Sequence, residues 1–269
     1  MSPSSLEEKF KALKLRLESL GSVLVAYSGG VDSSLLLKIA SLVLDKKVLA
    51  ITALSETYPL KETRSAKELA KKMKVRHEII RTKEFSDKDF RRNFPDRRYH
   101  CKKELFSSLL KIARRKNIKY VIDGSNADDL KDYRPGSRAK KELKIISPLQ
   151  ETGFTKKDVR LLSKRLGLGN WQKPALACLA SRIPFNTPIT KQKLSRIDRA
   201  ETLIRGKFNI KGNLRVRDHG DLARVELDRP EIRKVDPLKM DRILKNLGYK
   251  SSEIDPKGYI MGSLSVRVF

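Results

Sequence analysis

The chain has 269 residues, 39% of them hydrophobic, which is typical of a globular protein with one large domain or one large and one smaller domain. Its 60 Lys and Arg against 32 Asp and Glu residues give a net charge of +28, which favours polyanionic partners, although a lysine-rich solvated surface gives the same charge. Two cysteines are too few for a disulfide framework. No apolar run is long enough to span a bilayer and no signal peptide is visible, so we expect a cytoplasmic protein.

The first 123 residues alternate between helical and strand-like patterns. Apolar spacing predicts a helix over residues 6–20, a buried strand at 23–27 and a helix that presents Leu35, Ile39 and Val43 to the core. A strand at 48–53, a helix at 61–73, a strand at 75–80, a polar stretch at 82–99, a helix at 102–116 and a strand at 120–123 follow. This order predicts an α/β fold with a parallel sheet covered by helices on both faces.

The pattern changes after residue 150. Thr155 and Asp158 form a capping-box pattern that predicts a helix to about residue 166, and the proline-containing stretch 170–190 is an ordered linker or active-site loop. A helix carrying Leu194 and Ile204, strands at 213–218 and 222–227 joined by a hairpin turn, a helix at 236–247 and a strand at 264–269 follow. We therefore predict a large α/β domain at residues 1–184 and a smaller α+β domain at residues 185–269.

The most informative local pattern is Ser28-Gly29-Gly30-Val31-Asp32-Ser33-Ser34, between the first strand and the next helix. Glycines let the backbone turn tightly, and amides at the start of a helix bind phosphate oxygens. Ser28 and Ser33 add hydroxyl donors, and the carboxylate of Asp32 suits Mg²⁺ that bridges phosphates. An ordinary strand-to-helix turn also uses glycine, but the full string is far more specific. It lacks the lysine of a Walker loop, which disfavours a kinase or GTPase.

This string resembles the pyrophosphate loop of the PP-loop ATP-pyrophosphatase superfamily. The resemblance implies an adenine nucleotide alpha hydrolase-like fold and enzymes that cleave ATP between the α and β phosphates and place AMP on a substrate oxygen. Ligands of such sheets bind at the carboxyl ends of the strands, in loops 28–34, 54–60 and 124–134. On this basis the ATP-binding residues are expected to be Ser28, Gly29, Gly30, Asp32, Ser33, Ser34, Ala53, Gly124 and Asp128.

Three further segments narrow the family: residues 124–136, residues 173–184 and residues 215–226. Together with the loop, they resemble the ATP-dependent sacrificial sulfur transferases (LarE) of nickel-pincer nucleotide cofactor biosynthesis, over about residues 20–230. The resemblance implies that ATP adenylates a pyridinium carboxylate of a nicotinic-acid-derived mononucleotide. A cysteine thiolate then displaces AMP, and elimination leaves a thiocarboxylate on the substrate and dehydroalanine on the enzyme. The matching cysteine is Cys178.

The chemistry of Cys178 agrees with this role, because a thiolate is a strong nucleophile toward an activated acyl group. The neighbouring cations Lys173 and Arg182 are expected to lower its pKa. A buried structural cysteine is the alternative that the apolar neighbours alone suggest.

The arginines of the predicted hairpin indicate a binding site for a substrate phosphate. Arg215 and Arg217 alternate along one strand, so both lie on one face, where paired guanidiniums suit a phosphate together with Arg182. An exposed basic strand is the alternative. For Glu201 the resemblance implies a metal-binding acid, and a solvated carboxylate is equally compatible with its position.

The chain departs from relatives that carry three cysteines for an iron–sulfur cluster. In the segment Asn93 to Lys102, Arg98 stands where the first cysteine of a Cys-x-x-Cys pair is expected, and Cys101 remains. Cys101 and Cys178 alone are a poor anchor for a four-iron cluster, which would need a further ligand from His100 or a partner chain, so we do not expect a cluster. We expect ATP and Mg²⁺ as cofactors and a sacrificial Cys178.

Two other functions fit parts of the sequence. A PP-loop tRNA thiolase or tRNA-modifying ligase fits the net charge of +28, but no separate RNA-binding module or zinc cysteine pair is visible. A non-catalytic nucleotide-binding or scaffolding protein is disfavoured by Asp32 and Cys178. The expected partners are a small-molecule mononucleotide and further copies of the chain in a homo-oligomer. Nucleic acid is not expected, although the charge leaves it open, and no membrane is expected.

Overall fold

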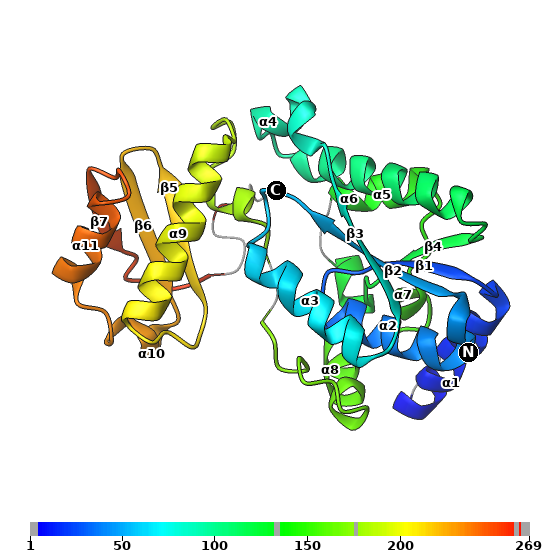
Figure 1. Cartoon of the computed structure of the whole chain (residues 1–269). Helices are drawn as coiled ribbons and strands as arrows, with labels where there is room; N and C mark the ends of the chain where they lie inside the picture. The colour runs from blue at the N-terminus through cyan, green and yellow to red at the C-terminus, as the bar shows by residue number, and fades with distance from the viewer. Residues whose placement is uncertain (1–4, 132–134, 175–176, 261–263, 265–269) are drawn as a thin grey trace. The chain divides into compact units, whose positions relative to one another are not determined.

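The computed structural model describes residues 5–131, 135–174, 177–260 and 264 (Figure 1). The chain divides into two compact units, one from Met1–Ser86 and Arg98–Leu176 and the other from Asp87–Arg97 and Ala177–Phe269. The predicted boundary between residues 184 and 185 lies within the second unit. Of the strand predicted at residues 264–269, all but Leu264 lie outside the described residues.

The first unit contains a parallel sheet of β1 (Val23–Ala26), β2 (Val48–Leu54), β3 (Arg76–Arg81) and β4 (Tyr120–Asp123). Their order is β3-β2-β1-β4, with Val25 opposite Ala50 on one side and Ile122 on the other. The chain runs outward from β1 to β3 and then returns to the other side of β1. The strand order therefore reverses between β1 and β4, which is where parallel sheets of this kind bind ligands.

Helices cover both faces of this sheet, as the alternation of strands and helices predicted. One face packs against α1 (Leu6–Leu20), α2 (Val31–Leu44), α3 (Leu60–Lys72) and α8 (Lys156–Arg165) (Figure 1). The other face packs against α5 (Arg97–Arg115). Val23 and Val25 face the first group of helices and Leu24 faces α5, because successive strand residues point to opposite faces.

Local signals set several helix starts. The predicted capping box at α8 is confirmed: the Thr155 hydroxyl accepts the Asp158 amide at 3.2 Å, and the Asp158 carboxylate accepts the Thr155 amide at 3.0 Å. A second box, from Ser5 and Glu8, opens α1.

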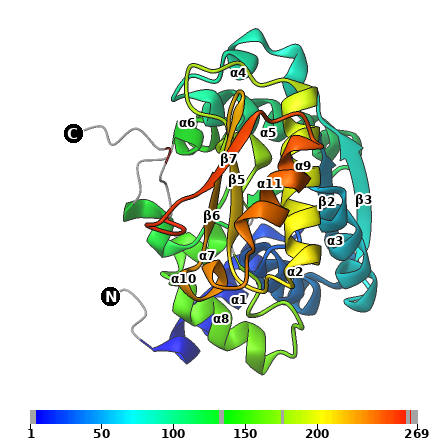
Figure 2. The same cartoon turned by 90° about the vertical axis from the view of Figure 1, so that its left-hand side faces the viewer.

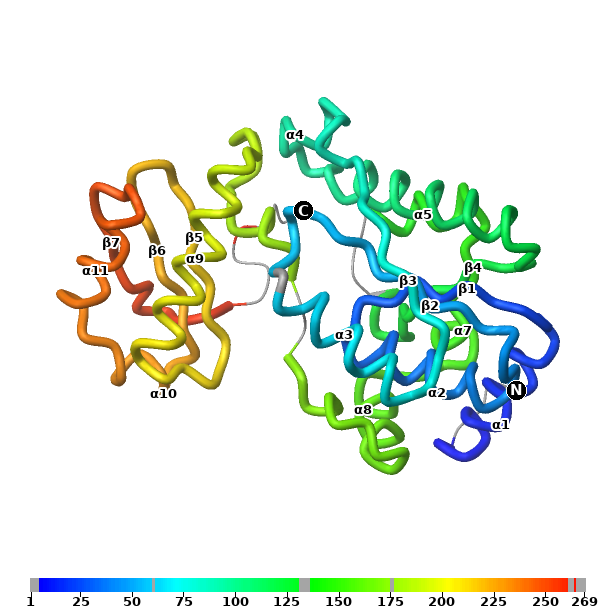
Figure 3. Tube along the Cα trace, in the orientation of Figure 1, coloured from blue at the N-terminus to red at the C-terminus, as the bar shows by residue number. Residues whose placement is uncertain are grey.

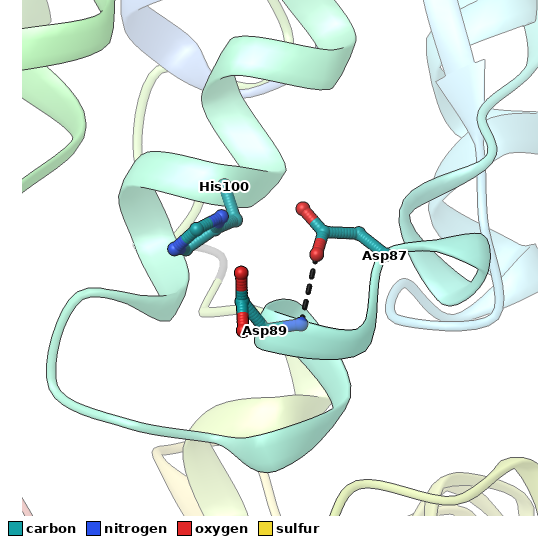
Figure 4. Close-up of side chains that lie close together, drawn as sticks. All are labelled: Asp87, Asp89 and His100. Atoms are coloured by element: carbon teal, nitrogen blue, oxygen red, sulfur yellow. Dashed lines mark hydrogen bonds between the residues drawn. The ribbon is translucent and has the colours of Figure 1, made fainter.

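The polar stretch 82–99 contains more structure than its sequence predicted. It holds η2 (Glu84–Ser86), α4 (Lys88–Arg92) and the first residues of α5, and the chain passes from β3 through α4 into α5 (Figure 3). Asp87 caps α4, since its carboxylate accepts the amide of Asp89 at 2.8 Å (Figure 4). Helix α5 begins at Arg97 rather than at residue 102, because Tyr99 is buried on the same side of the helix as Phe106.

Short elements complete the first unit. They are η1 (Asp45–Lys47), η3 (Ala127–Lys131), α6 (Pro135–Glu142) and α7 (Pro148–Glu151). These pieces of eight residues or fewer show no periodicity long enough to predict them. Ile146, just before α7, adds an isolated parallel bridge to Ile122 at the β4 edge.

The second unit is built around β5 (Leu214–His219), β6 (Leu222–Leu227) and β7 (Ser251–Ile254) in the order β5-β6-β7. The predicted hairpin between β5 and β6 is confirmed, with Gly220 at φ 79° in the turn. Helix α9 (Lys191–Lys207) packs against β5 and α11 (Pro237–Lys245) against β7 (Figure 2). The short elements η4 (Leu179–Arg182) and α10 (Arg229–Ile232) lie in the connections.

No helix among the described residues combines the length and apolar character that a membrane crossing requires.

Candidate active site

A cavity of about 260 Å³ opens in the first unit at the carboxyl ends of β1, β2 and β4. Its lining includes six of the residues predicted to bind ATP, which are Ser28, Gly30, Asp32, Ser33, Ala53 and Gly124. The three predicted loops therefore meet at one place, because the carboxyl ends of parallel strands share one edge of the sheet.

The loop after β1 needs glycine at position 29. Gly29 has φ 71°, and a Cβ atom there would lie 2.7 Å from the Cβ of Ala66 on α3. The loop is also closed by its own hydroxyls, since Ser33 Oγ donates to the Gly30 carbonyl at 3.2 Å and lies 3.1 Å from Ser28 Oγ. Gly30 caps α2 without a side chain, so amides of the first helical turn stay available to an anion.

The loop after β4 reaches the same helix start. A Cβ atom at Gly124 would lie 2.8 Å from the backbone nitrogen of Ser33, so the two loops approach more closely than any other residue allows. Ser125 and Asp129, which follow Gly124, therefore line the cavity beside residues 28–34, the phosphate loop.

Asp32 is fixed from two directions. The side-chain amide of Asn126 donates to Asp32 Oδ1 at 3.0 Å, and the ammonium of Lys156 contacts Oδ2. One oxygen of Asp32 thus already faces a cation, and carboxylate oxygen is a preferred ligand of Mg²⁺. The donor set at Asp32 fits a magnesium ion that also binds nucleotide phosphates.

Asn170 holds the phosphate loop through its side chain, and no sequence pattern predicted this role. Its side-chain amide donates to the Gly29 carbonyl at 3.2 Å and to Ser34 Oγ at 2.9 Å. Ser34 is fully buried and, like Gly29, does not line the cavity. Asp128 also lies outside the lining, and its carboxylate accepts the Lys156 amide at 2.8 Å. A direct contact of ATP with these three predicted residues stays a prediction.

Helix α5 adds two cations to the cavity wall. Arg98 and Lys102 line it, one turn apart. Burial lowers the pKa of Lys102, against the opposing effect of the negative charge of Asp123. An anion in the cavity would favour the charged form of this lysine. The sequence had marked Arg98 only as a replacement for a cysteine, and Cys101 lies half-buried on the same helix.

Cys178 lies in the second unit, immediately before η4, and is half-buried. Arg182 holds its backbone: the guanidinium donates to the carbonyls of Ala177 at 2.8 Å and Cys178 at 3.1 Å. Arg182 is only 3% exposed. Burial opposes its charge, but Glu201 and, more weakly, Cys178 raise the pKa of Arg182 above its ordinary value.

Glu201 forms the other half of this arrangement. Its two carboxylate oxygens accept hydrogen bonds from Arg182 at 2.8 and 3.0 Å, and one of them also accepts the Val216 amide at 3.1 Å. The carboxylate is therefore part of a buried ion pair rather than solvated. Its predicted role as a metal ligand stays a prediction, and a metal ion there would compete with Arg182.

Arg215 and Arg217 are buried rather than displayed on an exposed basic strand. Arg217 pairs with Glu226 at 2.5 Å and donates to the Ser181 carbonyl at 3.0 Å. Arg215 donates to its neighbour's carbonyl, that of Leu214, at 2.8 Å. Burial, with the positive charge of Arg182, lowers the pKa of Arg215. Within the described residues, no carboxylate forms an ion pair with Arg215, so this guanidinium suits an external anion.

The family model of asparagine synthase matches residues 7–184, which contain the parallel sheet, the phosphate loop and the cavity. The fold and the site thus define a PP-loop protein of the asparagine synthase type.

Similar proteins cover nearly the whole chain. A protein of Synechocystis sp., described as uncharacterised, is 39% identical over 265 residues, 97% of this chain and 98% of its own length. A Methanocaldococcus jannaschii protein of the same description is 35% identical over 227 residues, 84% of this chain and 82% of its own. The pyridinium-3,5-bisthiocarboxylic acid mononucleotide synthase of Lactiplantibacillus plantarum is 36% identical over 267 residues, 97% of this chain and 95% of that protein. Within the PP-loop class, the chain belongs to the family of this synthase, the LarE family.

Proposed function

We propose that this protein uses ATP to activate a carboxylate of a nicotinic-acid-derived pyridinium mononucleotide and converts it to a thiocarboxylate with sulfur from Cys178. The observation that carries this proposal is the cavity around Asp32, in a chain 36% identical to a mononucleotide synthase over 97% of its length. The sulfur atoms in the name of that synthase support sulfur insertion as the overall reaction.

In the first step, a carboxylate oxygen of the substrate bonds to the α-phosphorus of ATP. The bond from that phosphorus to the oxygen that bridges to the β-phosphorus breaks, and pyrophosphate leaves with the electron pair. Amides at the start of α2 and the hydroxyls of Ser28 and Ser33 bind the phosphates. When bound, a magnesium ion held by Asp32 would neutralise part of the phosphate charge.

In the second step, the Cys178 thiolate bonds to the acyl carbon, and AMP leaves with the electrons of the carbon–oxygen bond. A base then removes the Cα proton of Cys178, and the Cβ–S bond breaks with its electron pair moving to sulfur. The substrate leaves as a thiocarboxylate, and residue 178 becomes dehydroalanine. Arg182 fixes the backbone carbonyl of Cys178 for this chemistry.

The substrate phosphate is assigned to Arg215, Arg217 and Arg182 in the second unit. Arg182 and Arg217 already pair with carboxylates, so we infer that Arg215 makes the principal contact. Glu201 then acts by holding Arg182 in place.

We propose that no iron–sulfur cluster takes part. Arg98 occupies the position of a cluster cysteine and lines the nucleotide cavity instead. Cys178 is therefore consumed once in each molecule of enzyme. A cytoplasmic location and a homo-oligomeric assembly belong to the same proposal.

The decisive test is the whole-protein mass after incubation with ATP, Mg²⁺ and the carboxylated pyridinium mononucleotide. The protein should become lighter by one H₂S, with the change mapped to residue 178 by peptide sequencing. The Cys101→Ser variant should behave like the wild type, whereas Cys178→Ser should release pyrophosphate without losing mass. Multiple turnovers with an intact Cys178 would contradict the sacrificial mechanism. Sulfur transfer to tRNA but not to the mononucleotide would favour the tRNA thiolase.

A further inference from the structure

Lys156 occupies a position that neither the sequence patterns nor the proposed reaction assigns. It is the first residue of α8, and its ammonium pairs with Oδ2 of Asp32 across 124 positions of sequence. The side chains of Lys156 and Asp32 are 32% and 23% exposed, so solvent screens this pair only in part.

The two partners of Asp32 differ in mobility. Asn126 is 5% exposed, and its own side-chain oxygen accepts the Asp128 amide at 3.0 Å, so both ends of this side chain are held. Lys156 is held at its backbone, by Asp128 at 2.8 Å, but its ammonium stands on a flexible four-carbon stem. When a second cation approaches Asp32, Asn126 keeps the carboxylate oriented and the Lys156 ammonium is free to swing away.

Asn126 already donates to Asp32 Oδ1, and the Lys156 ammonium contacts Oδ2, the oxygen left for a metal ion. A magnesium ion bound through Oδ2 would therefore compete with the Lys156 ammonium for the same oxygen. Without nucleotide, an unpaired Asp32 would repel incoming phosphate and attract free metal ions. Lys156 removes both effects by neutralising the carboxylate.

We propose that Lys156 is an exchangeable counter-ion of Asp32: it neutralises the carboxylate before nucleotide binds and yields to Mg²⁺ that arrives with the nucleotide. The inference rests on the proposed function only in requiring that this cavity binds a magnesium nucleotide.

The test measures binding of Mn²⁺, as a probe for Mg²⁺, to the nucleotide-free protein by electron paramagnetic resonance. Lys156→Met keeps the length of the side chain and removes the charge, so its affinity for Mn²⁺ alone should rise about tenfold. Its affinity for ATP in EDTA should fall, because Asp32 then repels the phosphates. A lysine that only tied α8 to α2 would weaken both affinities when replaced.

Matched variants separate the possible causes. Lys157→Met changes the exposed neighbour on the same helix and should leave both affinities unchanged. Lys156→Arg keeps the charge and should retain the Mn²⁺ affinity of the wild type. Asp32→Asn should abolish the gain in Mn²⁺ affinity in the Lys156→Met background.

An unchanged or lower Mn²⁺ affinity in Lys156→Met overturns the counter-ion role. A gain that persists in Asp32→Asn overturns it as well, because the metal would then bind elsewhere. Neither measurement needs the sulfur acceptor, so failure of the proposed reaction would leave these results interpretable.

Discussion

Replacing Gly29 tests whether the phosphate loop is held by its close approach to α3. Gly29→Ala introduces a Cβ atom 2.7 Å from the Cβ of Ala66 and forces a non-glycine residue to φ 71°. Ordinary contacts between carbon atoms are about 3.5–4.0 Å, so the loop or the helix must move. Both partners lie in the first unit.

The expected loss of stability has two parts. A left-handed backbone costs an L-residue about 1–2 kcal/mol. Overpacking of a filled site costs about 1–3 kcal/mol. Gly29→Ala should therefore lower the free energy of unfolding by about 2–5 kcal/mol and weaken ATP binding, because the displaced loop no longer presents its amides.

Ala66→Gly provides the control, because it removes the atom that the new methyl group meets. Alone it should cost about 1 kcal/mol through helix propensity. In the double variant the closest contact disappears, but the new Cβ atom still lies 3.0 Å from the Cα of residue 66, so the overpacking is relieved only in part. The two changes should therefore couple favourably by about 1 kcal/mol.

Urea unfolding followed by the fluorescence of Trp171 measures these values, since the chain has one tryptophan and it belongs to the first unit. Additive effects of the two substitutions, or a Gly29→Ala variant as stable as the wild type, would refute the argument from close approach.

Three further substitutions and one control test other features of the two units. Asn170→Ala removes two hydrogen bonds to the phosphate loop and should cost about 1–3 kcal/mol in urea unfolding, with weaker ATP binding by calorimetry. Glu201→Gln leaves Arg182 buried with a neutral partner and should destabilise the second unit by about 3 kcal/mol, seen as faster amide exchange in β5. The control Glu253→Gln breaks an exposed pair and should cost no more than about 1 kcal/mol. Burial, aided by the negative charge of Glu201, raises the pKa of Asp198 above 3.8. The Asp198 carboxyl group therefore binds its proton more tightly in the folded unit than in the unfolded chain. Stability then falls as the pH rises from 3.8 through the raised pKa, and Asp198→Asn should stabilise the unit at neutral pH but not below pH 3.8; equal melting curves at neutral pH would contradict this.

The sequence predicted the features that depend on neighbouring residues. The order of β1 to β4 and of the longer helices follows from apolar spacing, and the capping box at Thr155 and the hairpin at Gly220 follow from local chemistry. The short helices and β7 were not predicted. The phosphate loop was visible because its glycines and hydroxyls are adjacent in the chain. Its family resemblance then supplied the class of reaction, which the comparisons with known proteins support.

Only the tertiary structure showed which side chains hold that loop. Lys156 meets Asp32 across 124 positions and Asn170 meets Ser34 across 136 positions, and no local pattern marks either partner. In the second unit, the structure also decided that Arg215 and Arg217 are buried and that Glu201 pairs with Arg182. The spacing of apolar residues predicts which face of a helix or strand is buried. The partner of a charged side chain depends instead on where the fold brings distant segments together.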